Sequence, residues 1–255
     1  MSDTLRLYDL LDSPFCLKAR IVLALKHVPY ERVVANLSRR SELRRLNPLA
    51  KVPVLVVVGR EALSDSSRIA RFVEGEFPRP PLLPKDASSR AYCHLLEEWA
   101  DESLYFLIGA FKWLNPANRA RAYTATSELV PSLLPKRLTM NLVRRGIAKR
   151  YRAQGYGAEH LAHLQERMAE NLACLSDLLA DKPFLLGRFV TLADIAVFAQ
   201  LAWMSGYEEK RLLEAMPLVQ KWMAQLEAVE EVQEAMRGEA PRAVADATEN
   251  LAASV

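Results

Sequence analysis

The chain has 255 residues, of which 51% are hydrophobic and 25% are charged. These fractions are ordinary for a folded globular protein, and they exclude a disordered, collagen-like or disulfide-stapled chain. The 34 basic and 31 acidic side chains give a formal net charge of +3, which is too balanced to make nucleic acid the expected partner.

The cysteines, Cys16, Cys93 and Cys174, are odd in number and widely spaced. That pattern favours neither a disulfide framework nor a zinc site, and it suits a reducing compartment. No apolar run approaches the roughly 18 residues of a membrane span, and the first residues do not resemble a signal peptide. We therefore expect a cytoplasmic protein with no transmembrane segment and no metal.

Short strands alternate with helices over the first 80 residues. Hydrophobic periodicity predicts, in chain order, strand 5–10, helix 14–26, strand 31–35, helix 41–46, strand 52–58, strand 61–63 and helix 66–77. The strand–helix–strand crossover at the start predicts a parallel pair. Gly59 suits the first central position of a type II′ turn in the hairpin. This order of elements is typical of a thioredoxin-like domain.

Four prolines within residues 78–84 predict a linker, because proline can continue neither a helix nor a central strand. After it, apolar side chains recur at spacings of three and four residues, which predicts helices. These are expected at 87–113, 158–180, 191–204 and 218–236. We expect an α/β domain at 1–80, an all-α domain at 87–237 and a flexible tail at 238–255.

Three segments of the first part carry chemistry. Ser13 and Pro14 stand where a helix should begin, and the free N–H groups there would stabilise a thiolate. A cis bond before Pro53 would leave the main chain of Val52 free to pair with an extended ligand. Asp65 opens another helix and could hold an ammonium group. Each segment also has a purely structural explanation. Ser13 and Asp65 could simply cap their helices, and Pro53 could be an ordinary trans proline at a sheet edge.

Taken together and in this order, these segments resemble the cytosolic glutathione S-transferases of the serine-type, bacterial-like group. The segments that carry the resemblance are Ser13-Pro14-Phe15-Cys16, residues 47–55, residues 63–69 and residues 184–194. The resemblance covers about residues 5–236, and it implies a thioredoxin-like N-terminal domain followed by an all-α C-terminal domain. It also implies a glutathione co-substrate, no metal and a homodimer.

The resemblance implies roles for individual residues. Ser13 would be catalytic, donating a hydrogen bond to the glutathione sulfur. Glutathione would be bound by Lys51, Val52, Pro53, Asp65 and Ser66. An apolar co-substrate would lie against Phe15, Leu104, Phe111 and Trp113. The implied enzyme activates the thiol of glutathione for conjugation, isomerisation or reduction of an apolar electrophile. The alternative is a non-catalytic member of the fold that serves as a binding module.

The chain departs from the common pattern of the family in two places. Ser13 stands where a dithiol motif would have its first cysteine, so a dithiol cycle is excluded, and we expect Cys16 to be buried. Residues 103–158 hold ten cations and a single acid, Glu128, and resemble the insertions of metaxin-like and failed-axon-like relatives. Within them, residues 138–152 predict a basic helix near the mouth of the cleft.

We expect that helix to pack inward through an apolar stripe formed by Leu138, Leu142, Ile147 and Tyr151. Its cationic face would then stay in solvent. That face is either a solubilising surface or a contact for an anionic ligand, a membrane surface or a protein partner.

Overall fold

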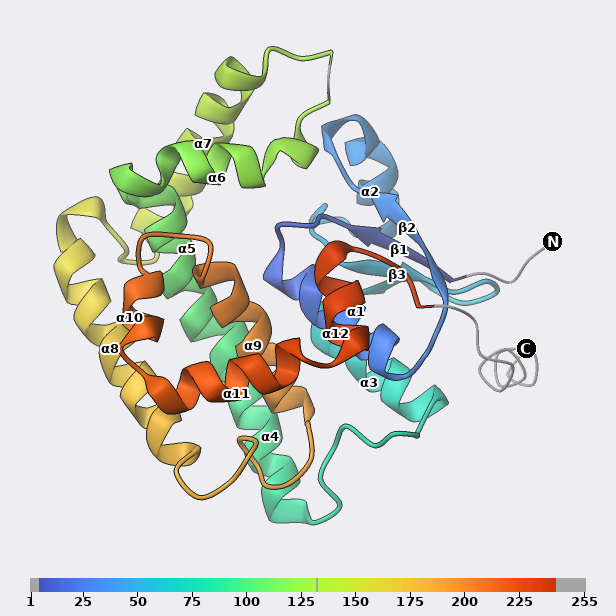
Figure 1. Ribbon diagram of the computed structural model, residues 1–255. Coiled ribbons are helices and arrows are strands. Elements are labelled where there is room, and N and C mark those ends of the chain that lie inside the picture. Colours follow the sequence, from blue (N-terminus) through green and yellow to red (C-terminus); the bar gives the residue numbers. More distant parts are fainter. Residues whose placement is uncertain (1–4, 132, 242–255) are drawn as a thin grey trace.

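The computed structural model describes residues 5–131 and 133–241 (Figure 1). Its first part is a four-stranded sheet in the order β2-β1-β3-β4. The strands are β1 (Leu5–Asp9), β2 (Tyr30–Val34), β3 (Val54–Val56) and β4 (Leu63–Ser64). Strand β1 is parallel to β2 and antiparallel to β3, which in turn pairs antiparallel with β4. The predicted order of strands and helices and the thioredoxin-like domain are confirmed.

Helices cover both faces of this sheet because successive side chains of a strand point to opposite faces. Leu7 and Leu55 belong to the main core, into which α1 (Pro14–Leu25) and α3 (Ser66–Glu76) also pack. Tyr8 and Val54 form a smaller cluster with Leu43 of α2 (Arg40–Leu46).

The second part of the chain is helical. Its helices are α4 (Ala87–Glu98), α5 (Tyr105–Leu114), α6 (Arg119–Ala125), α7 (Lys136–Ala153), α8 (Leu161–Leu178), α9 (Leu192–Met204), α10 (Lys210–Glu214), α11 (Pro217–Glu227) and α12 (Glu230–Arg237). A π-helical turn, η2 (Trp99–Leu104), joins α4 to α5, so the long helix expected at 87–113 is continuous but not uniform. The helix expected at 218–236 is divided in two, because α12 begins anew after Val229.

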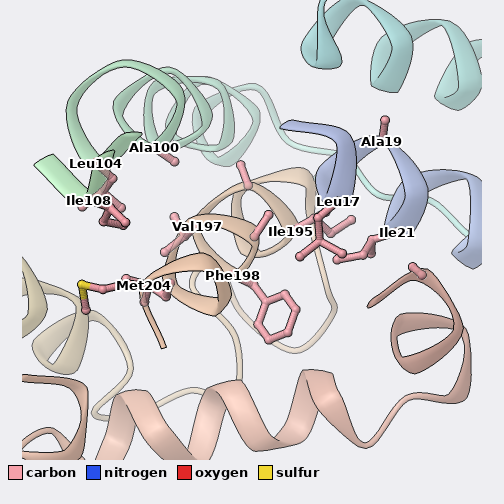
Figure 2. Packing of buried hydrophobic residues seen from close by; sticks show 14 of the residues in the cluster. Leu17, Ala19, Ile21, Ala100, Leu104, Ile108, Ile195, Val197, Phe198 and Met204 are labelled. Atoms are coloured by element: carbon pink, nitrogen blue, oxygen red, sulfur yellow. The ribbon is translucent and has the colours of Figure 1, made fainter. Parts of the chain in front are cut away.

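Helix α9 lies at the centre of the molecule, in contact with α1, α4 and α5. It begins at the predicted capping box, in which Thr191 and Asp194 satisfy each other's main-chain N–H groups. Its residues are buried on every side: Ile195 lies beside Leu17 and Ile21 of α1, and Val197 lies on the side of Leu104 and Ile108 (Figure 2). Helix α12 returns from the end of the helical part to pack on α1 (Figure 1).

The β3–β4 turn and helix α7 differ from what the sequence predicts. The β3–β4 turn runs from Val57 to Arg60, with Gly59 as its third residue at φ +75°, rather than first in a type II′ turn. The predicted apolar stripe of α7 is half right. Ile147 and Tyr151 pack inward as expected, whereas Leu138 and Leu142 are exposed and Met140 is buried in their place. The proposed tail lies mostly outside the described residues. No helix in the described ranges is long and apolar enough to cross a membrane.

Candidate active site

Ser13 stands at the N-terminus of α1, directly after the loop that follows β1. It is the N-cap of that helix, and its Oγ accepts a hydrogen bond from the main-chain N–H of Cys16 at 3.4 Å. Pro14 is the first helical residue, a position where the missing N–H costs nothing. The half-buried hydroxyl therefore lies beside main-chain N–H groups that carry partial positive charge.

Asp12 ties this loop to the helical part of the molecule. Its carboxylate pairs with the ammonium of Lys112, accepts from Thr126 Oγ1 at 3.0 Å, and accepts from Trp203 Nε1 at 3.3 Å. The Lys112 ammonium also lies 4.6 Å from the ring centroid of Trp113 and 5.0 Å from that of Trp203. Burial lowers the pKa of Lys112, and the neighbouring Asp12 opposes that effect. The pair fixes the loop against α5 and α9.

Glu128 holds the same loop from a second direction. Its Oε2 accepts from the main-chain N–H of Leu11 at 2.8 Å, and its Oε1 accepts from Arg32 Nη2 at 2.7 Å. Arg32 in turn bonds the buried carboxylate of Asp9, 2.5 Å from Nε to Oδ2. The one acid of the basic segment 103–158 is thus used to brace the loop before Ser13.

A cleft of about 320 Å³ lies between the two parts of the chain. From the thioredoxin-like part it is lined by Ser13, Phe15, Lys51 and Val52. From the helical part it is lined by Tyr105, Phe106, Trp113, Ile147, Arg150 and Trp203, among others. The ring centroids of Phe15 and Tyr105 are 4.7 Å apart. The ring of Tyr105 stacks on that of Trp203, with 5.7 Å between their centroids. The cleft has an aromatic wall that faces Ser13, and it can take a flat apolar group.

The structure brings part of the predicted co-substrate wall together. Phe15 and Trp113 line the cleft. Leu104 and Phe111 are fully buried in the core and do not line it, because their faces of η2 and α5 pack inside the helical part. The cleft is completed instead by Tyr105, which periodicity alone could not distinguish from its neighbours.

The peptide bond between Val52 and Pro53 is cis, as predicted. Val52 is half-buried and lines the cleft, whereas Pro53 is buried behind it. Lys51 is exposed on the same rim, and its main-chain oxygen accepts from Asn47 Nδ2 at 2.9 Å. The segment therefore presents both main chain and a cation next to Ser13.

Asp65 is the exposed N-cap of α3, where its Oδ1 accepts from the main-chain N–H groups of Ser67 and Arg68 at 2.9 and 3.0 Å. It has a φ of +85°, a backbone conformation that residues other than glycine rarely adopt. The side chain of Ser66 is buried, and neither residue contributes to the lining of the cleft as Ser13 and Lys51 do.

A buried ion network lies directly behind this helix start. Lys18 Nζ is 2.6 Å from Glu97 Oε1, 2.7 Å from Asp101 Oδ2 and 2.8 Å from Ser67 Oγ. Ser67 Oγ also donates to Asp101 Oδ2 at 3.1 Å. Burial raises the pKa of Asp101, although Lys18 opposes the rise. Asp101 reaches the wall of the cleft, so the network links α1, α3 and α4 to the site.

Cys16 is fully buried, which confirms the expectation for that residue. Burial is also the main reason that the pKa of its thiol is raised, with the nearby Asp9 carboxylate adding to the effect. A thiol in this state is a poor nucleophile.

Sequence reasoning did not find Asp12, Lys112 or Trp203, whose contacts join positions about a hundred or more apart in the chain. Nothing in the local sequence around them signals a site. Among the residues that the structure describes, no group of three or more His, Cys, Asp or Glu side chains could hold a metal ion.

Comparisons with known proteins match both parts of the chain. The family model described as glutathione S-transferase, N-terminal domain, matches residues 12–76, and the model of the corresponding C-terminal domain matches residues 158–225. Together the two models match about half of the chain.

Two curated relatives are similar to this protein over about a third of its chain. The sequence is 37% identical over 93 residues to glutathione S-transferase Z1 of Arabidopsis thaliana, covering 35% of this chain and 42% of that protein. It is 39% identical over 93 residues to a probable maleylacetoacetate isomerase of Caenorhabditis elegans, covering 35% and 43%. The chain thus spans less than half of the length of these relatives.

Solved structures match over nearly the whole chain. The beta-etherase LigF from Sphingobium sp. strain SYK-6 is similar with a TM-score of 0.70 and 22% identity, covering 92% of this chain and 100% of that one. A glutathione transferase family member from Pseudomonas fluorescens pf-5, solved with two glutathione bound, has a TM-score of 0.68 and 19% identity, covering 94% of each chain. At these identities the likeness concerns the fold.

Proposed function

Because the chain belongs to the glutathione S-transferase superfamily, we propose that it binds glutathione in this cleft and activates the thiol for reaction with an apolar electrophile. The reaction is a conjugation, an isomerisation or a reduction. The observation that carries the proposal is the position of Ser13, at a helix N-terminus and on the wall of a cleft with an aromatic far side. The isomerase named among the relatives supports isomerisation as one of the three.

In this proposal Ser13 turns its hydroxyl proton toward the glutathione sulfur. The N-terminal N–H groups of α1 add partial positive charge, and both effects favour the thiolate over the thiol. The thiolate is the nucleophile, and the cleft holds the electrophile within its reach. Phe15, Tyr105 and Trp203 supply the apolar surface on which the electrophile lies.

The rest of glutathione extends along the rim of the thioredoxin-like part. The main chain of Val52 pairs with the cysteinyl backbone, in the manner of an added strand. Lys51, exposed beside it, attracts the glycyl carboxylate. Asp65 receives the γ-glutamyl ammonium, and the buried Ser66 contributes its main-chain N–H, a first-turn group without an intrahelical partner.

The test is the replacement of Ser13 by alanine, asparagine and threonine. Alanine removes the hydroxyl and the helix cap, asparagine keeps a capping oxygen without a hydroxyl, and threonine keeps both. We expect the first two variants to turn over a generic electrophile at least about tenfold more slowly, a barrier increase of about 1.4 kcal/mol. Threonine should retain most of the rate.

Calorimetric titration with glutathione accompanies these rates. If all three variants turned over the electrophile as fast as the unaltered protein, Ser13 would have no catalytic role. Binding of glutathione without turnover in the unaltered protein would favour the non-catalytic alternative.

We also propose a two-fold homodimer, in which α4 of one subunit packs against the thioredoxin-like part of the other. Tyr92 and Leu95 lie exposed on α4, and Leu49 and Val58 are exposed on the thioredoxin-like part. Tyr92 and Leu95 are three residues apart on one face of α4, and contiguous exposed apolar side chains mark interaction surfaces. Light scattering of the unaltered chain should give a dimer mass, and a Tyr92→Ser/Leu95→Ser variant should give a monomer. A monomer mass for the unaltered chain at micromolar concentration would refute the dimer.

The proposed location is the cytoplasm. Cys16, Cys93 and Cys174 are all free in the structure. Unpaired thiols persist in a reducing compartment, where glutathione is also maintained in its reduced form.

A further inference from the structure

Helix α7 carries charge of one sign along its whole length. Its cations are Lys136, Arg137, Arg144, Arg145, Lys149, Arg150 and Arg152, and it contains no acid. None of these seven side chains forms an ion pair within the described part of the chain. The neighbouring helices α5 and α6 contain no acid either. Glu128, before α7, is occupied by Arg32 and Leu11, and Glu159 lies six residues beyond the C-terminal end of α7. The positive charge is therefore not compensated locally.

The same region exposes large apolar side chains. Leu133, Leu138 and Leu142 are 95%, 61% and 59% exposed, and Leu134 is exposed beside them. On α7 the inward positions are taken by Met140 and Tyr151, which pack against the core of the helical part. The exposed leucines therefore do not belong to the side of α7 that packs against the core. They are a second apolar face that nothing in the described chain covers.

The leucines and several of the cations occupy one side of the helix. Leu138, Leu142, Arg145, Lys149 and Arg152 follow at spacings of four, three, four and three residues, which places them on a single face. Lys136 and Arg137, exposed in the first turn, line a hollow with Met140 and therefore lie beside this face rather than on it. Figure 1 shows α7, in yellow-green, at the periphery of the helical part. We call Leu133, Leu134, Leu138, Leu142 and the five surrounding cations the α7 surface.

We propose that the α7 surface docks onto an anionic lipid bilayer, with the four leucines entering the interface and Lys136, Arg137, Arg145, Lys149 and Arg152 contacting headgroups. A basic helix with an apolar side lies in the plane of such an interface. Arginine and lysine can keep their charges at the headgroups while their aliphatic stems follow the leucines inward. Each near-surface cation adds to the attraction of anionic lipid.

Two other occupants fit the same observations less well. A second copy of this chain would bring two uncompensated cationic faces together, and like charges in close contact repel. Nucleic acid would use the cations but not four exposed leucines, and α7 offers no exposed aromatic ring on which a base could stack.

The test is sedimentation of the full chain with sucrose-loaded vesicles. Vesicles of phosphatidylcholine containing a third phosphatidylserine are compared with pure phosphatidylcholine, at low salt and at physiological salt. We expect binding to the anionic vesicles and little binding to the neutral ones. Salt should weaken the binding without abolishing it, because the screening length of about 8 Å at 0.15 M affects the charges and leaves leucine insertion unaffected.

Two double variants separate the components of the surface. Arg145→Gln/Lys149→Gln should weaken binding to anionic vesicles about 25-fold, since each near-surface charge is worth about a factor of five. Leu138→Ser/Leu142→Ser should weaken it at least about tenfold and remove the salt-resistant fraction. The matched controls are Arg188→Gln/Lys221→Gln and Phe189→Ser, which alter exposed cations and an exposed apolar side chain elsewhere. The controls should bind as the unaltered chain does.

Four outcomes would overturn the proposal. One is equal binding to neutral and anionic vesicles, and another is unchanged binding by both α7 double variants. The third is a fall in molecular mass, by light scattering, for Leu138→Ser/Leu142→Ser, which would assign the leucines to a second copy. Binding to polyglutamate but not to vesicles would likewise assign the surface to an acidic polypeptide.

Discussion

Replacing Lys18 with methionine would leave two carboxylates without their ammonium inside the protein. The side chain of Lys18 is 1% exposed, and those of Glu97 and Asp101 are 3% and 12% exposed. Methionine keeps most of the volume, so the change isolates the charge. The remaining cation near the network is weakly placed, with Arg71 Nη2 3.8 Å from Glu97 Oε2.

Breaking a buried pair by removing one partner costs about 3–5 kcal/mol. We expect the lower end, about 3 kcal/mol, because Asp101 keeps the hydrogen bond from Ser67 and some exposure to solvent. For a chain of this size that corresponds to a fall in melting temperature of about 6–12 °C. The same change should loosen the start of α3, since Lys18 holds Ser67.

The effect of pH has a definite sign. Burial raises the pKa of Asp101 in the folded protein, so the folded state holds that proton more tightly than the unfolded state. Its ionised carboxylate therefore costs stability above the folded pKa, and the cost is relieved as the pH falls. Lys18 favours the ionised form, so its removal enlarges the cost. The deficit of Lys18→Met should thus be greatest near neutral pH and shrink on acidification.

Urea unfolding near pH 7 and pH 5 measures these differences. Glu97→Gln, which removes one carboxylate and leaves Lys18 paired with Asp101, should cost less than about 1 kcal/mol. Lys210→Met, which breaks an exposed pair with Glu214 at 3.2 Å, should change stability by less than about 0.5 kcal/mol. A deficit for Lys18→Met below about 1 kcal/mol, or one that grows on acidification, would refute the reasoning.

Three further changes probe the packing around the site. Cys16→Ser should cost more stability than activity, and in the native protein a bulky thiol reagent should label the exposed Cys174 much faster than the buried Cys16; rapid labelling of Cys16 would contradict its burial. Gly109→Ala would place a Cβ 1.7 Å from the hydroxyl oxygen of Tyr151, so we expect a loss of about 1–3 kcal/mol by thermal unfolding, and an unchanged melting temperature would contradict that packing. Asp194→Ala would leave several buried donors unpaired and should cost about 3–5 kcal/mol, with a loss below about 1 kcal/mol as the contrary result.

Most of the fold could be predicted because its signals are local. Ser13, Asp65 and the Thr191–Asp194 box each cap a helix within a few residues of themselves. The break between α11 and α12 was missed because the apolar period continues across it, and a period carries no information about a change of helix direction.

The error in α7 has a different origin. Two apolar faces run along this helix, one containing Leu138 and Leu142 and the other containing Met140 and Tyr151. The predicted stripe joined Leu138 and Leu142 to Ile147 and Tyr151, although the five-residue step from Leu142 to Ile147 crosses to the opposite side of the helix. In the structure Tyr151 packs where Gly109 leaves room, a match between positions 42 apart that no local pattern reveals.

The site was predictable in the part that is local in sequence. Ser13, Phe15, Lys51 and Val52 lie in two short segments, and all four line the cleft. The partners that fix them come from far along the chain, as the contact between Asp12 and Trp203 illustrates. Such pairings depend on how the helical part packs on the sheet, and therefore on the whole fold.

One buried hydrogen bond of Arg20 can form only late in the synthesis of the chain. Its buried guanidinium bonds Asp9 at 2.6 Å, but its Nε donates to the main-chain oxygen of Ala235, which lies 215 positions later. At about 5–20 residues per second, a ribosome needs on the order of 10–40 s to deliver that acceptor. During this interval Arg20 of the nascent thioredoxin-like part is not covered by α12, and its Nε lacks the acceptor that it has in the folded protein. The emerging chain therefore closes its thioredoxin-like part with α12, which is made more than 200 residues after Arg20.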